Sequence, residues 1–111
     1  MADLTARQII EDMPDLFRPE RAGRANAVVQ FNLTGDGGGD WYITIKNRTC
    51  TVDEGLAEKP TATVIMEAST YVALSTGKLG SMKAFTSGKV KASGDLTIMR
   101  RMENWFLKPQ V

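Results

Sequence analysis

The residues best suited to chemistry are a Gly-Lys pair, a lone cysteine and two adjacent carboxylates. Gly77 and Lys78, in the segment STGKLGS, resemble part of a phosphate-binding loop. Such a loop also needs an upstream glycine at a fixed spacing and a Ser or Thr directly after the lysine, where it binds magnesium. This sequence lacks that upstream glycine and has Leu79 after the lysine. We therefore do not expect phosphate catalysis at this segment.

The sequence contains no histidine, so it offers no Ser-His or Cys-His pair and no imidazole metal ligand. Asp53 and Glu54 fall in a segment that reads as a turn, where solvated carboxylates are the ordinary interpretation. Proton transfer would require one of them to be buried with a perturbed pKa. Cys50 alternates with Val52 and reads as a small core residue. We therefore expect no enzyme activity, no metal site and no cofactor.

Composition favours one soluble globular domain spanning residues 1–111. Of its residues, 42% are hydrophobic and 24% are charged, which suits a single modest core. No apolar run approaches the roughly 20 residues that span a bilayer, and no secretory signal is visible. The single cysteine cannot form an internal disulfide, in agreement with a reducing compartment. We expect a cytoplasmic protein.

Charge is distributed unevenly along the chain. The net charge of +1 argues against a general nucleic-acid binder. From Lys78 onward the sequence has seven basic and two acidic residues, whereas the preceding part has seven basic and eleven acidic residues. Two interpretations remain open: solvated faces, or a basic rim that meets an anionic ligand or a membrane surface.

The amino-terminal part has helical signals. Thr5 and Gln8 form a capping-box pattern, which predicts a helix over about 5–13. Pro14 and Pro19 can each begin a short helical turn.

The pattern then changes to the two-residue period of strands, first from Ala27 to Thr34 and then from Trp41 to Lys46. The glycine-rich segment GDGGGD lies between them. A dinucleotide-binding loop would be followed by a helix, but a strand follows here, so we expect a hairpin. Asn47 and Arg48 predict a tight turn into a third strand.

The remaining chain predicts a fourth strand at residues 62–66, two short helices, a short fifth strand in GKVKASG and a final amphipathic helix. We expect Ser69 and Ser81 to cap the two short helices and Asp95 to cap the final helix.

Taken in order, several segments resemble the sterol carrier protein type 2 domain family, also called non-specific lipid-transfer proteins. They are MPDLFRPERA, VVQFNLTG, WYITIKN, TATVIME, TYVALSTGKL, KAFTSGKVKASGDL and the closing amphipathic helix. The resemblance runs from about Ala2 to Trp105. It implies an α+β fold with a five-stranded, mainly antiparallel sheet, covered on one face by helices, and an apolar tunnel between the sheet and the carboxyl-terminal helices.

The resemblance also implies a function. Members of the family bind fatty acids, fatty acyl-CoA, phospholipids or sterols and transfer them without catalysis. We therefore expect a lipid or fatty acyl-CoA ligand, transient membrane contact and no nucleic-acid partner. The alternative is an interaction module, whose apolar surface forms a homodimer or docks onto a partner enzyme.

We predict a single apolar pocket formed where the strand and helix faces meet. Its expected lining is Phe31, Leu33, Trp41, Ile43, Ile45, Val64, Met66, Phe85, Leu96, Ile98 and Met102. Flexible methionine side chains suit ligands of varied shape, although an ordinary core that Met66, Met99 and Met102 simply fill is the competing interpretation. Lysines at the entrance are expected to favour an anionic head group, namely Lys78, Lys83, Lys89 and Lys91.

Overall fold

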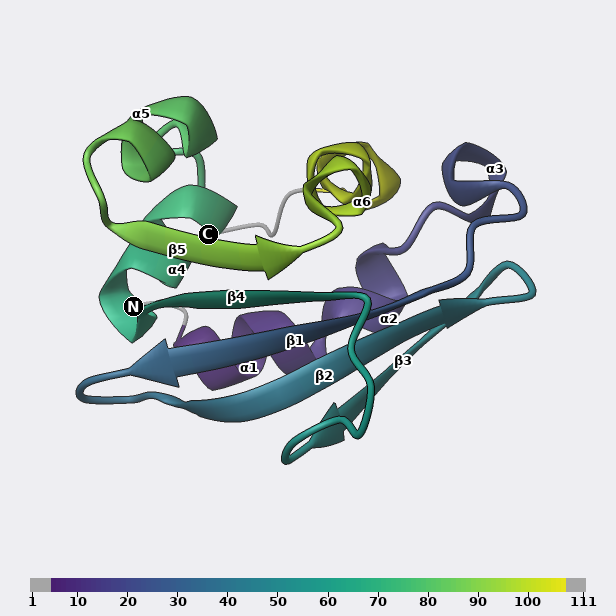
Figure 1. Ribbon diagram of the computed structural model, residues 1–111, viewed down its shortest axis with the longest axis horizontal. Coiled ribbons are helices and arrows are strands. Elements are labelled where there is room, and N and C mark those ends of the chain that lie inside the picture. Colours follow the sequence, from purple (N-terminus) through teal and green to yellow (C-terminus); the bar gives the residue numbers. More distant parts are fainter. Residues whose placement is uncertain (1–4, 108–111) are drawn as a thin grey trace.

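The structure is a computed structural model that describes residues 5–107. It contains a five-stranded sheet, short helices at both ends of the chain and two helices between the fourth and fifth strands (Figure 1). In chain order the elements are α1 (Ala6–Glu11), α2 (Met13–Leu16), α3 (Pro19–Ala22), β1 (Ala27–Thr34), β2 (Gly39–Lys46), β3 (Thr49–Glu54), β4 (Ala62–Glu67), α4 (Ala68–Ser75), α5 (Ser81–Thr86), β5 (Val90–Gly94), α6 (Leu96–Met102) and the 3-10 helix η1 (Glu103–Trp105).

The sheet has the strand order β3-β2-β1-β4-β5. All neighbouring strands are antiparallel except β1 and β4, which are parallel. This confirms the expected α+β class and mainly antiparallel sheet. The glycine-rich segment joins β1 to β2 as a hairpin, with Phe31 opposite Trp41. Asn47 and Arg48 have φ angles of 53° and 61°, as the tight turn between β2 and β3 requires.

One face of the sheet is covered and the other is partly open. Along β1, β2 and β4, alternate residues are buried, the pattern of a sheet packed on one side. In Figure 1, α1 and α4 lie behind the strands, and α5 and α6 lie above β5. The helices contribute Ile9, Ile10 and Tyr71 to the same buried cluster as the inward strand residues. The core therefore lies between the inner sheet face and the helices.

Two of the predicted caps are present. Thr5 Oγ1 accepts a hydrogen bond from Gln8 N at 3.1 Å, and Gln8 Oε1 accepts one from Thr5 N at 2.8 Å. Asp95 Oδ1 accepts hydrogen bonds from Thr97 N and Ile98 N at 3.1 and 3.3 Å. These contacts satisfy amide groups that have no partner within the first turn of a helix.

Two other caps were predicted wrongly. The helix α4 begins at Ala68 directly after β4, so Glu67 occupies the cap position and Ser69 lies inside the helix. The helix α5 begins at Ser81 itself, with Gly80 before it. In both places the residue before the helix has an extended backbone, with ψ angles of 149° at Glu67 and 143° at Gly80. Asp53 and Glu54 likewise lie at the end of β3, opposite Tyr42 and Trp41, and not in a turn.

A buried glutamine holds the connection that makes the parallel pair possible. This connection runs from the edge strand β3, past β2 and β1, to β4 (Figure 1). Gln30 Nε2 donates to the carbonyl oxygens of Trp41 and Gly55 at 3.1 and 3.0 Å. Its Oε1 accepts from Ala57 N at 2.8 Å. The buried Gln30 side chain thus satisfies two part-buried backbone groups of the connection, Gly55 O and Ala57 N.

We expect Gln30→Leu to lower the free energy of unfolding by about 2 kcal/mol, because it leaves the Ala57 amide and Gly55 carbonyl without partners. Urea unfolding followed by circular dichroism measures this. Thr44→Val, a half-buried position on β2, is the control and should change stability by about 0.5 kcal/mol or less. Equal midpoints for both variants would contradict this role of Gln30.

Candidate functional site

The inner face of the sheet brings most of the predicted lining residues together. Eight of the eleven belong to one buried hydrophobic cluster: Phe31, Leu33, Trp41, Ile43, Ile45, Val64, Met66 and Met102. Ile98 is partly buried and packs against that cluster. The strand residues share a face because their side chains alternate, and α6 turns Met102 toward them.

Phe85 and Leu96 lie elsewhere. Their exposed fractions are 50% and 41%, so they lie outside the buried cluster that the strand residues form. The six-residue helix α5 contacts β5 at the edge of the sheet and buries Ala84, which leaves Phe85 turned outward. Leu96 is the first residue of α6, whose buried residue is Met102 at its other end. Neither position could be inferred from local apolar periodicity.

Other core residues were not included in the predicted lining. Tyr71 of α4 packs its ring edge against Phe31, with 5.7 Å between the ring centroids. Its hydroxyl donates to Met13 Sδ at 3.3 Å, and burial raises the pKa of this phenol. Trp105 of η1 is buried in the same cluster. Both lie in predicted helices, and only the packing of those helices on the sheet shows which side they bury.

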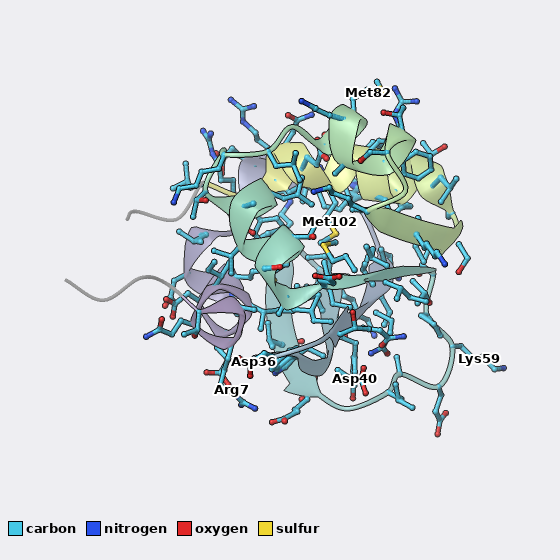
Figure 2. The ribbon with its side chains drawn as sticks, turned by 90° about the vertical axis from the view of Figure 1, so that its left-hand side faces the viewer. Arg7, Asp36, Asp40, Lys59, Met82 and Met102 are labelled. Carbon is cyan, nitrogen blue, oxygen red and sulfur yellow. The ribbon has the colours of Figure 1, made fainter. Side chains whose placement is uncertain are left out.

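The inner face is closed by its own side chains. Ile43 and Ile45 have no exposed surface, so a ligand between sheet and helices would have to displace side chains. Flexible thioethers are present for this in Met13, Met66 and Met102. Figure 2 shows Met102 in the middle of the molecule, whereas Met82 of α5 points outward at the surface.

Two shallow surface pockets, both open to solvent, occur among residues 5–107. One, of about 380 Å³, is lined by Gly23, Arg24, Asn47 and Arg48. The other, of about 570 Å³, is lined by Arg21, Arg101, Asn104 and Trp105. None of the eleven predicted lining residues contributes to either pocket. The apolar tunnel that the resemblance implies is therefore neither of these two pockets.

The four predicted head-group lysines are all exposed, and none lines either pocket. Lys78 lies between α4 and α5, Lys83 on α5, and Lys89 just before β5. Lys91 lies on β5 opposite Ile65, on the outer side of the sheet. They surround α5 and β5 without converging on one cavity.

The lone cysteine is not set up as a nucleophile. Cys50 packs against the core cluster together with Val52, as expected from their shared inward face. Burial raises the pKa of its thiol to about 12, so the thiolate is scarce near neutral pH. No three His, Cys, Asp or Glu side chains gather as metal ligands within residues 5–107. None of the helices described is long and apolar enough to cross a membrane.

A comparison with protein families decides the classification. Residues 7–107 match the family described as the SCP-2 sterol transfer family. The chain belongs to this family. The match covers nearly every residue that the structure describes, and it confirms the resemblance seen in the sequence.

Curated relatives of this family member are much longer proteins. Hydroxysteroid dehydrogenase-like protein 2 of Mus musculus is 33% identical over 91 residues, which are 80% of this chain and 18% of the relative. Sterol carrier protein 2 of Homo sapiens is 32% identical over 69 residues, 62% of this chain and 13% of the relative. The chain thus spans less than a fifth of either protein and is similar to one segment of each.

Solved structures share the fold of this family member. Sterol Carrier Protein 2 Like 2 from Aedes aegypti superposes with a TM-score of 0.73 at 23% identity, covering 89% of this chain and 91% of its own. The Aedes aegypti sterol carrier protein 2 in complex with palmitate gives 0.68 at 19% identity, covering 96% and 99%. A sec-alkylsulfatase from Pseudomonas sp. gives 0.83 at 19% identity, covering 96% of this chain but 17% of the sulfatase. The same fold thus occurs in small carriers and within a larger enzyme.

We expect Ile43→Asp to lower the free energy of unfolding by about 3 kcal/mol or more, because a carboxylate at a fully buried position must lose its hydration or bind a proton. The same substitution at Ile65, which is 41% exposed on the outer face, is the matched control. It should cost about 1 kcal/mol or less. Thermal and urea unfolding of both variants give the comparison, and similar losses would mean that the inner and outer faces are assigned wrongly.

Proposed function

We propose that the chain binds a lipid between the inner sheet face and the helices and transfers it between membranes without catalysis. The observation that carries this proposal is the family match over residues 7–107. The inner face supports it, because its clustered apolar side chains can surround an acyl chain. Fatty acids, fatty acyl-CoA, phospholipids and sterol-like molecules are the candidate cargoes.

Within this site, the eight clustered residues are the proposed walls of the lipid cavity, and Ile98 extends them. Phe85 and Leu96 contact the cargo only when α5 or the start of α6 moves. Such a rearrangement is compatible with short helices, since α5 has six residues and α6 has seven.

The energetics of apolar burial suit a carrier. Removing about fifteen methylenes from water is worth on the order of 12 kcal/mol, at roughly 0.8 kcal/mol for each methylene and before ordering costs. A membrane offers the same gain. The protein therefore needs only to match the membrane to exchange its cargo, and a cavity that closes when empty avoids exposing apolar surface to water.

The absence of histidine from the sequence and the raised pKa of Cys50 support a role without catalysis in this chain. We place this role in the cytoplasm, where an unpaired cysteine stays reduced.

We also propose that α5 makes the transient membrane contact. Met82 is 73% exposed and Phe85 is 50% exposed, and their three-residue spacing places them on one side of the helix. Lys78, Lys83 and Lys89 lie beside them in the chain and are exposed. Apolar side chains flanked by lysines suit an anionic bilayer surface.

We expect the purified protein to carry about one lipid per chain, which mass spectrometry of an organic extract and of the intact complex measures. Delipidated protein should take up decanoic acid in calorimetry. Protein that is free of lipid, binds neither decanoate nor decanol and forms a stable dimer would instead support the alternative, an interaction module.

We expect Met82→Gln combined with Phe85→Gln to weaken binding to vesicles that contain phosphatidylserine by about tenfold, because two apolar side chains no longer enter the interface. Co-sedimentation measures the bound fraction. Leu56→Gln, at an apolar residue 71% exposed on the connection between β3 and β4, should leave binding unchanged. Equal losses for both variants would show that α5 is not the contact surface.

A further inference from the structure

The pocket between α3 and η1 has the chemistry of an oxyanion site. Its lining residues are Arg21, Arg101, Asn104 and Trp105, which carry two guanidinium groups, one side-chain amide and one indole. Guanidinium groups present paired N–H donors in a plane that matches carboxylate and phosphate oxygens. This surface is open to solvent, so a head group of either kind can reach these donors.

The two arginines are available to a ligand. Among residues 5–107, the ion pairs are formed by Arg7 and Arg18, so neither pocket arginine has a carboxylate partner there. Glu20, next to Arg21 in the chain, is paired with Arg18 Nε at 3.1 Å. Arg21 therefore interacts with Glu20 only at longer range, where it helps to lower the pKa of that carboxyl, and its guanidinium group forms no ion pair with it.

The pocket also adjoins the apolar core. Trp105 is 2% exposed and belongs to the core cluster together with Met102 and Ala22. The Arg101 guanidinium lies over its ring, 5.8 Å from the centroid. The backbone of Trp105 is held by contacts that do not involve its indole. Arg18 N donates a hydrogen bond to Trp105 O at 2.6 Å, and the next residue, Phe106, forms a β-bridge with Phe17. One indole therefore separates a polar pocket from the core.

We propose that Arg21, Arg101 and Asn104 bind the carboxylate or phosphate of a lipid head group, and that the Trp105 indole moves aside to admit the attached chain to the core. This inference rests on the proposed lipid-binding function and deepens it. It places the head group beside α3 and α6, not among the lysines around α5 and β5, and Figure 1 shows α3 and α5 at opposite ends of the molecule.

Calorimetry with three ten-carbon probes tests the site: decanoate, monodecyl phosphate and decanol. They have equal chains and differ in the head group, so the ratio of affinities isolates the oxyanion. The double variant Arg21→Gln, Arg101→Gln should bind at least one of the two anionic probes about tenfold more weakly than the wild-type protein does. Its affinity for decanol should be unchanged. The more affected anion identifies carboxylate or phosphate as the preferred group.

Arg100→Gln is the matched control, because Arg100 is exposed on the same helix but does not line the pocket. It should leave all three affinities unchanged. The proposed site would be overturned if Arg100→Gln lowered the affinity for the anionic probes as much as the double variant does. It would also be overturned if the double variant lowered the affinity for decanol as much as for both anions. A loss of anion affinity in Lys89→Gln but not in the arginine variant would also overturn it and place the head group near β5.

Fluorescence tests the movement of the indole. The sequence has two tryptophans, so Trp41→Phe leaves Trp105 as the only one. We expect decanoate to change the emission wavelength of Trp105 and its quenching by acrylamide. Arg101→Gln in that background removes one of the two arginines and should shift the response to about threefold higher decanoate. Binding of decanoate without any change in Trp105 emission would contradict the proposed movement of the indole. Failure of wild-type protein to bind any of the three probes would refute the proposed function itself.

Discussion

The structure depends on the burial of the apolar inner face of β1 and β2. Trp41, Ile43 and Ile45 are almost completely removed from water. They lie on β2, which forms an antiparallel hairpin with β1. A two-stranded hairpin alone cannot bury this face. Helices from both ends of the chain have to cover it, so segments distant in sequence meet on one side of the sheet.

The parallel pairing of β1 with β4 sets where α4, which follows β4, begins relative to the sheet. It requires a long connection from the edge strand β3, and Gln30 satisfies the backbone groups of that connection inside the protein. Because β4 then runs directly into α4, Tyr71 reaches the ring of Phe31. A buried polar side chain on one face of the sheet thereby helps to order the apolar layer on the other.

The proposed carrier role requires this layer to be both stable and adaptable. Tightly packed cores resist changes of volume, but methionine side chains can rearrange at low cost. Short helices also limit how much structure a movement disturbs. The charges around the layer differ at its two ends: single lysines surround α5 and β5, whereas two arginines, an amide and an indole converge between α3 and η1.

Local patterns in the sequence determined much of the fold. The two-residue alternation specified the inward faces of β1, β2 and β4, the capping box of Thr5 and Gln8 specified the start of α1, and Asp95 specified the start of α6. These features depend on neighbours in the chain, so they could be predicted without knowing the packing. Only the tertiary structure decided which helical side chains reach the core. Phe85 and Leu96 are exposed, Trp105 is buried, and Arg21 and Arg101 line the same pocket, because these outcomes depend on how separate helices pack on the sheet.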